Sequence, residues 1–218
     1  MRSSRQIAAI SALLWICGFA GTATSAQQTI DRIAARVDEE IVLQSDVEQL
    51  ARYQLLVDGK AESDSQILDR LIDQWIVKKE AEASRFPAAS DADVERGMQR
   101  LLRSFAKKED FDAQRAKVGL SDEDVRQIVA AQAYLSNYLD SRFRPTVQVE
   151  EKAIQDFYDK AVVPRAKARG QEPPTFDAAR DVIQEVLIQQ GINEQADKWL
   201  KESRTRLSIT KYLTDNVR

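Results

Sequence analysis

The sequence predicts a mainly α-helical fold with one small antiparallel sheet that joins the two ends of the chain. From Thr175 onward, apolar residues recur at steps of three and four, which is typical of an amphipathic helix. From Leu207 the period changes to two, which suits a half-buried strand. A lone strand leaves its backbone groups unpaired, and the other strand-like pattern lies in residues 30–43. We therefore expect an N-terminal hairpin to pair with a C-terminal strand.

Residues 1–26 have the pattern of a secretory signal peptide. A short basic start with Arg2 and Arg5 precedes an apolar run, and small residues end the segment at Ala26. An uncleaved membrane anchor is the alternative, although the apolar run is short for a span of ~20 residues. Cys17, the single cysteine, lies inside this segment. We expect cleavage after Ala26, export, and no stable membrane insertion afterwards.

The composition of the remaining 192 residues excludes several classes of function. They contain neither cysteine nor histidine, which excludes disulfides, ordinary zinc sites and nucleophilic schemes that use a histidine base. No phosphate-binding loop of the ATPase type is present. Residues 1–26 hold two of the 32 basic residues and none of the 35 acidic ones, so the remainder has a net charge of −5. This charge disfavours nucleic acid and anionic membrane as partners, and we predict no catalytic, cofactor-binding or metal-binding residue.

The first elements are a hairpin and a capped helix. Residues 30–37 and 41–43 are the expected strands, with a tight turn at Asp38 and Glu39. Ser45 followed by Glu48 has the spacing of a capping box, and this helix should end near Gly59.

Four further helices are predicted up to Pro145. The next one begins at Ser63 or Ser65, carries a broad apolar face, and stops before Pro87. The other three are a helix capped by Ser90, a short one over residues 111–118, and a long one from Ser121. The acidic clusters at 91–95 and 122–124 fall in first helical turns, where the helix dipole favours carboxylates, and predict no calcium site.

The last third of the chain contains a linker and a closing helix. Residues 150–160 are expected to be helical, and the polar, basic, proline-containing segment 161–174 is expected to be an exposed loop. The closing helix follows from Thr175. Gly191 within it costs about 1 kcal/mol relative to alanine, so the sequence leaves open whether this helix is straight and continuous.

Several apolar and aromatic side chains on the predicted helices admit two interpretations. At helical spacing most of them should be core residues. A minority could instead line an apolar groove for extended peptides, where adaptable side chains such as methionine also serve well. The candidates for peptide binding are Met98, Leu102, Phe105, Phe111, Tyr134 and Tyr138.

Three stretches together resemble the SurA-like family of periplasmic chaperones. The opening IDRIAARVDEEIVLQSDVEQL is similar to the family's hairpin and capped helix. ILDRLIDQWIVKKEAEA, with the helical segments that follow it up to residue 160, resembles the helical lobe. FDAARDVIQEVLIQQGINEQADKWLKESRTRLSI resembles the closing helix and strand. The resemblance implies a SurA-like, trigger-factor-like helical chaperone core built from residues 27–160 and 175–218.

One departure from the family bears on the activity. Relatives normally carry one or two parvulin-type prolyl isomerase domains between linker and closing helix, whereas here residues 161–174 separate those elements. The resemblance therefore implies a non-enzymatic, ATP-independent holdase in the periplasm. It would bind unfolded outer-membrane or secreted polypeptides without any cofactor. The alternatives are an envelope adaptor with one fixed protein partner and, less favoured, a peptidyl-prolyl isomerase.

Overall fold

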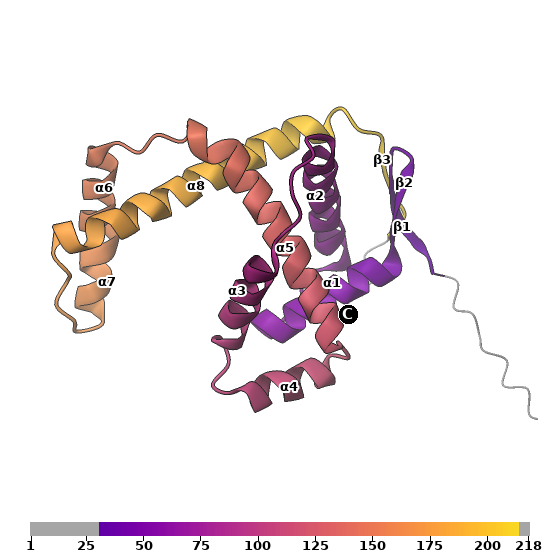
Figure 1. The fold of residues 1–218 in the computed structure, drawn as a ribbon, viewed down its shortest axis with the longest axis horizontal. Coiled ribbons are helices and arrows are strands. Elements are labelled where there is room, and N and C mark those ends of the chain that lie inside the picture. Colours follow the sequence, from indigo (N-terminus) through magenta and orange to yellow (C-terminus); the bar gives the residue numbers. More distant parts are fainter. Residues whose placement is uncertain (1–30, 214–218) are drawn as a thin grey trace, which may run out of the picture. The chain divides into compact units, whose positions relative to one another are not determined.

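The computed structural model describes residues 31–213, which form eight α-helices, two short helical turns and three strands (Figure 1). The expected signal peptide and its cleavage site lie outside the described residues. In chain order the elements are β1 (Ile33–Val37), β2 (Glu40–Leu43), α1 (Gln44–Asp58), α2 (Asp64–Ala83), α3 (Asp91–Leu102), α4 (Lys108–Lys117), α5 (Asp122–Phe143), η1 (Arg144–Thr146), α6 (Glu151–Phe157), η2 (Tyr158–Val162), α7 (Val163–Ala168), α8 (Phe176–Arg204) and β3 (Ile209–Lys211). The predicted fold class, mainly α with a small antiparallel sheet, is confirmed.

The two ends of the described chain meet in a three-stranded antiparallel sheet of order β2-β1-β3. Val37 pairs with Glu40 across the hairpin turn and with Ile209 on the other side. The turn and the C-terminal strand also exchange bonds: the Asp38 N–H donates to the Ser208 carbonyl at 2.9 Å, and the Ser208 N–H donates to Asp38 Oδ1 at 2.8 Å. The predicted meeting of hairpin and C-terminal strand is therefore confirmed, although β3 is shorter than residues 207–212.

The start of α1 differs from the prediction. Its N-cap is Leu43 rather than Ser45, and the N–H of Leu43 donates to Asp46 Oδ2 at 3.0 Å. Ser45 instead directs its N–H and hydroxyl to the carboxylate of Asp31, which precedes the hairpin. Because Asp31 supplies an acceptor from outside the helix, the helix begins two residues earlier than the local pattern indicates.

The serine caps predicted for α2, α3 and α5 are confirmed. The side chains of Ser63, Ser90 and Ser121 accept hydrogen bonds from the N–H three residues later, at 3.3, 3.2 and 3.0 Å. Each of these bonds satisfies a helical N–H that has no partner inside the helix. Local chemistry therefore sets where these three helices begin.

The main core lies where the sheet packs against α1, α2 and parts of α3, α4 and α5. Ala35 and Val37 of β1 are fully buried, as are Ile67, Leu68 and Ile72 of α2. This is the broad apolar face predicted for α2. No helix within residues 31–213 carries an apolar stretch long enough to cross a bilayer.

The closing helix α8 runs without a break through Gly191 for 29 residues. A Cβ atom on Gly191 would lie 2.7 Å from Val147 Cγ1, so the missing side chain lets the segment after α5 approach α8 closely. The helix is thus continuous at Gly191, and the glycine serves a close packing contact. The second half of α8 contacts the helical lobe through Ile192 and Ala196, which are buried beside Phe143.

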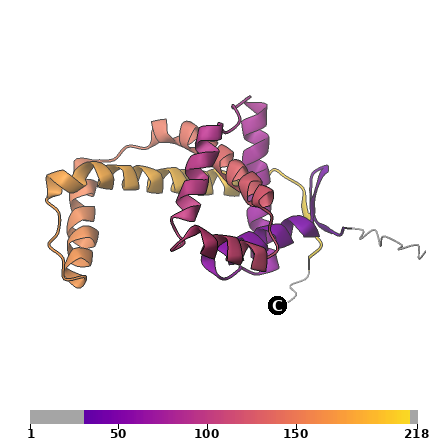
Figure 2. The ribbon, with the colours of Figure 1, turned by 60° about the horizontal axis from the view of Figure 1, so that its bottom comes forward.

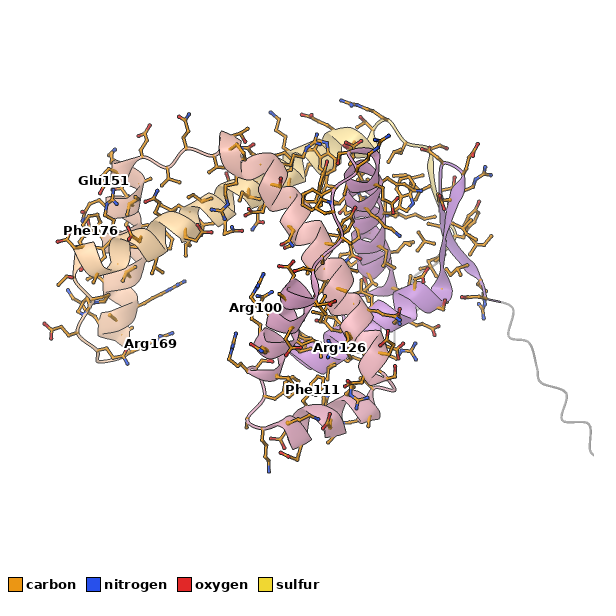
Figure 3. All side chains as sticks on the ribbon, in the orientation of Figure 1. Arg100, Phe111, Arg126, Glu151, Arg169 and Phe176 are labelled. Atoms are coloured by element: carbon orange, nitrogen blue, oxygen red, sulfur yellow. The ribbon has the colours of Figure 1, made fainter. Side chains whose placement is uncertain are left out.

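The first half of α8 packs against α6 and η2 (Figure 1 and Figure 2). Ile154 and Ile183 are buried there, and the rings of Tyr158 and Phe176 meet edge to face at 5.5 Å. Glu151 and Phe176 mark this region in Figure 3, where Glu151 Oε2 is 2.6 Å from Arg180 Nη2. These contacts form a small core separate from the main one.

The segment expected to be a loop, residues 161–174, is partly helical. Helical backbone continues through η2 and α7 to Ala168, and mostly exposed residues then lead to α8. The expectation was wrong in this respect because the helical backbone continues through Pro164, directly after the π-helical turn η2. Proline lacks the N–H that would continue the helical ladder, and its ring crowds the carbonyl four residues earlier. The π-helical turn η2, which directly precedes α7, interrupts the regular ladder at this point.

Candidate functional site

A cleft of about 490 Å³ lies between β2, α1, α2 and α5. We call it the β2 groove, and it is the principal candidate for a binding site in the described part of the chain. Its lining residues are Ile41, Val42, Asp46, Gln49, Leu50, Leu71, Gln74, Trp75, Lys78, Gln127, Ile128, Ala131, Gln132, Tyr134 and Leu135. More than half of these side chains are apolar, and they come from four elements.

The apolar floor of the β2 groove follows from helical geometry. On α2, Leu71, Trp75 and Lys78 form one row at steps of four and three, beside the buried row that packs into the core. Trp75 is partly buried, and Lys79 Nζ lies 5.8 Å from the centre of its ring. Lys79 also bonds Glu40 at 2.8 Å and so holds the start of β2 to α2. This bond lowers the pKa of the Glu40 carboxyl.

The polar lining consists mainly of glutamines. Gln49 donates to Asp124 Oδ1 at 3.4 Å, and Gln132 accepts from the hydroxyl of Tyr53 at 3.3 Å. Primary amides offer both donors and acceptors, as a peptide backbone does. Asp46 and Lys78 are the charged residues of the lining, so the β2 groove carries almost no net charge.

A second cleft continues the β2 groove along α1. The two share Leu50, Gln74 and Gln132, and the second one reaches toward Glu62 and Arg70. Glu62 accepts from Arg70 Nη2 at 2.6 Å, and this bond, with a further one from Gln54, lowers the pKa of Glu62 to about 2. The concave surface is therefore longer than the β2 groove alone.

The structure does not bring the six predicted peptide-binding residues together. Tyr134 lines the β2 groove, and partial burial raises the pKa of its hydroxyl. Met98 and Phe111, the latter labelled in Figure 3, are buried in the main core, and Tyr138 is buried beside Phe86. The last two, Leu102 and Phe105, are partly exposed and pack on the main core. A role in peptide binding stays a prediction for these residues.

Sequence reasoning missed most of the groove. Ile128 and Leu135 of the long helix, and Leu71 and Trp75 on the apolar face of α2, were not among the six predicted candidates. Ile41, which is 53% exposed and lies in the expected strand 41–43, was not among them either. The sequence did contain an indication of the groove. The apolar faces of α2 and α5 are broader than one packing partner covers, so part of each face is left to line a groove.

The lining of the β2 groove presents apolar and amide groups. Within residues 31–213, no group of three or more histidine, cysteine, aspartate or glutamate side chains is arranged to hold a metal ion. An apolar floor with an amide rim matches a polypeptide segment that presents both side chains and backbone.

Comparison with known proteins relates the chain to one group of chaperones. A scan against protein-family models finds no match. The chain is 28% identical over 149 residues to a protein named Chaperone SurA from Pseudomonas fluorescens (strain Pf0-1), a match that covers 64% of this chain and 35% of the relative. It is 27% identical over 146 residues to Chaperone SurA from Pseudomonas syringae pv. tomato, covering 63% and 34%. The chain thus spans about a third of the length of these relatives. The matches support a SurA-like relationship and, at this distant similarity, a chaperone-like function.

Proposed function

We propose that this protein is an ATP-independent periplasmic holdase that binds unfolded outer-membrane or secreted polypeptides in the β2 groove. The observation that carries the proposal is an open, apolar and nearly neutral groove with an amide rim. Such a surface accepts many apolar segments and prefers none strongly. The SurA-like relationship supports the same conclusion.

The proposal requires weak and reversible contacts. The sequence holds no phosphate-binding loop, so nucleotide hydrolysis of that type is not available to drive release. A groove that stays open to solvent desolvates its ligand incompletely, which limits the affinity of each contact. Bound segments would therefore leave spontaneously on the time scale of folding.

The proposed activity is non-enzymatic. The chain contains no histidine, and its one cysteine lies in the expected signal peptide. Between α6 and α8 the chain forms η2, α7 and a short connection. According to the resemblance, this is the position at which the family carries its isomerase domain. We propose that prolyl isomerisation stays at its uncatalysed rate, a step of tens to hundreds of seconds that makes weak catalysis easy to detect.

Aggregation of several unrelated, chemically unfolded clients tests the proposal. The mature protein should slow light scattering at near-stoichiometric ratios without ATP. Ile41→Ser should raise the concentration needed for half-protection by about threefold to tenfold, because it removes exposed apolar surface from the groove.

Val182→Ser is the matched control, since Val182 is 67% exposed on α8 and does not line the groove. It should protect clients as well as the wild type does. Protection of one client alone would favour the adaptor with a fixed partner, and acceleration of prolyl isomerisation would overturn the non-enzymatic proposal.

A further inference from the structure

The β2 groove follows the open edge of β2. This strand is outermost in the sheet, and within residues 31–213 no strand pairs with its outer side. Consecutive strand residues point to opposite faces, yet Ile41 and Val42 both line the groove. The groove meets β2 at these two residues, and Ile41 is 53% exposed there.

The register shows which backbone groups face the groove. The Gln44 N–H donates to the Arg32 carbonyl at 2.8 Å, so it points toward β1. The N–H and C=O groups of successive strand residues point alternately to the two sides of the strand. Those of Glu40 and Val42 therefore point toward β1, and those of Ile41 and Leu43 point outward. The outward N–H of Leu43 is already bonded to Asp46. The C=O of Leu43, the N-cap residue, accepts the first hydrogen bond of α1. The N–H and C=O of Ile41 are thus the groups that an added strand would meet.

We infer that the client segment binds as an added strand on the edge of β2. This inference rests on the proposed function and specifies its substrate class: an extended, uncharged segment with alternating apolar residues. Its main chain would bond to Ile41, while every second side chain would contact Trp75 and Ile128. The nearly neutral lining fits an uncharged segment. By contrast, the cleft between α3 and α5 is lined by Asp91, Glu95 and Glu123, with Arg126 (Figure 3) as the basic residue of the lining.

Main-chain recognition explains how one groove could serve many sequences. Every polypeptide except at proline offers the same N–H and C=O groups. The edge presents few outward groups, so the added strand would be short and its binding weak. Sequence tolerance and easy release would then have one structural cause.

Backbone methylation of a client peptide provides the test. The probe is a fluorescently labelled seven-residue peptide of alternating valine and threonine, with its binding to the mature protein measured by anisotropy. Two derivatives carry N-methyl groups on alternate residues: one is methylated at the valine amides, and the other at the threonine amides. Because alternate amides of an added strand face β2, methylation in one register should weaken binding at least tenfold, and in the other register about twofold or less.

Two variants at one position test the same bond from the protein side. Ile41→Thr and Ile41→Pro both reduce the apolar surface, but only proline removes the outward N–H. Proline is tolerated at such an edge position because this N–H takes no part in the ladder. Ile41→Pro should bind about fivefold more weakly than Ile41→Thr, with thermal unfolding confirming that both are folded.

The outcomes separate this inference from the proposed function. Equal binding of the parent and both methylated peptides would overturn the added strand while leaving a groove that recognises side chains. If Ile41→Pro does not fold, the methylated peptides decide alone. If the parent peptide does not bind and no client is protected, the proposed function fails and the inference fails with it.

Discussion

Gly97 of α3 shows how one missing side chain sets the distance between two helices. A Cβ atom there would lie 2.5 Å from Val129 Cγ1 of α5. Alanine is the better helix former by about 1 kcal/mol, but Val129 is 5% exposed and has little room to move. We expect Gly97→Ala to lower the free energy of unfolding by about 1–3 kcal/mol, measured by urea denaturation.

A compensating substitution serves as the control for Gly97. Gly97→Ala combined with Val129→Ala should recover part of the loss relative to Val129→Ala alone, because the new methyl group fills space that the smaller residue leaves. A Gly97→Ala protein more stable than the wild type would show that the helices separate freely.

Two carboxylates give the stability a predictable dependence on pH. Hydrogen bonds from Arg70 and Arg144 lower the pKa values of Glu62 and Glu185 to about 2, from an ordinary value of 4.5. Because the pKa is lower in the folded state, each ionised carboxylate contributes fully to the free energy of unfolding above pH 4.5. This contribution is lost as the pH falls toward 2. The melting temperature should therefore decrease as the pH is lowered from about 4.5 to about 2. In the double variant Glu62→Gln/Glu185→Gln, the melting temperature should decrease less steeply with falling pH than in the wild type. If it decreases equally steeply in both proteins, these two carboxylates are not the cause of the pH dependence.

At the scale of the element, local chemistry predicted most helix starts and failed where distant residues intervene. Ser63, Ser90 and Ser121 cap their helices with groups three residues away, so a short stretch of sequence contains all the information. The start of α1 depends on Asp31, 14 residues before Ser45, and no local pattern reports that bond. Helical backbone at Pro164 was not predicted because proline usually ends a helix, whereas here a π-helical turn directly precedes it and the helical backbone continues.

The strand β3 is predicted to stabilise the whole sheet. It covers the outer side of β1, and Lys211 Nζ bonds Asp69 of α2 at 2.7 Å. Removing residues 206–218 would expose the edge of β1 and the apolar groups beneath it. We expect aggregation or a fall of at least 10 °C in the melting temperature.

A chain that ends at Leu213 is the matched control for this truncation. It keeps β3 and the contact of Leu213 with the main core, and it should melt like the full-length protein. Equal melting of the chain that ends at residue 205 would show that β3 contributes little.

At the scale of the whole described chain, the fold could be predicted and the groove could not. Periodicity identifies which face of a helix is apolar, and the ends of the chain have to pair because lone strands are costly. Whether an apolar face is covered depends on neighbours far away in the sequence. Trp75 and Leu135 belong to wide apolar faces whose inner rows are buried, while their own row is left to line the groove. Met98 and Phe111 were equally plausible candidates by spacing, but α1 and its neighbours enclose them.

The pairing of β3 with the hairpin has a consequence for the time course of folding. Asp38 and Ser208 are 170 residues apart, so their mutual bonds cannot form until nearly the whole chain has been made. For an exported chain, the interval ends only when the C-terminal residues have also been exported. During it the hairpin can form locally within microseconds, but β1 has no partner on its outer side. Until the C-terminal residues are present, the chain therefore carries an open strand edge of its own.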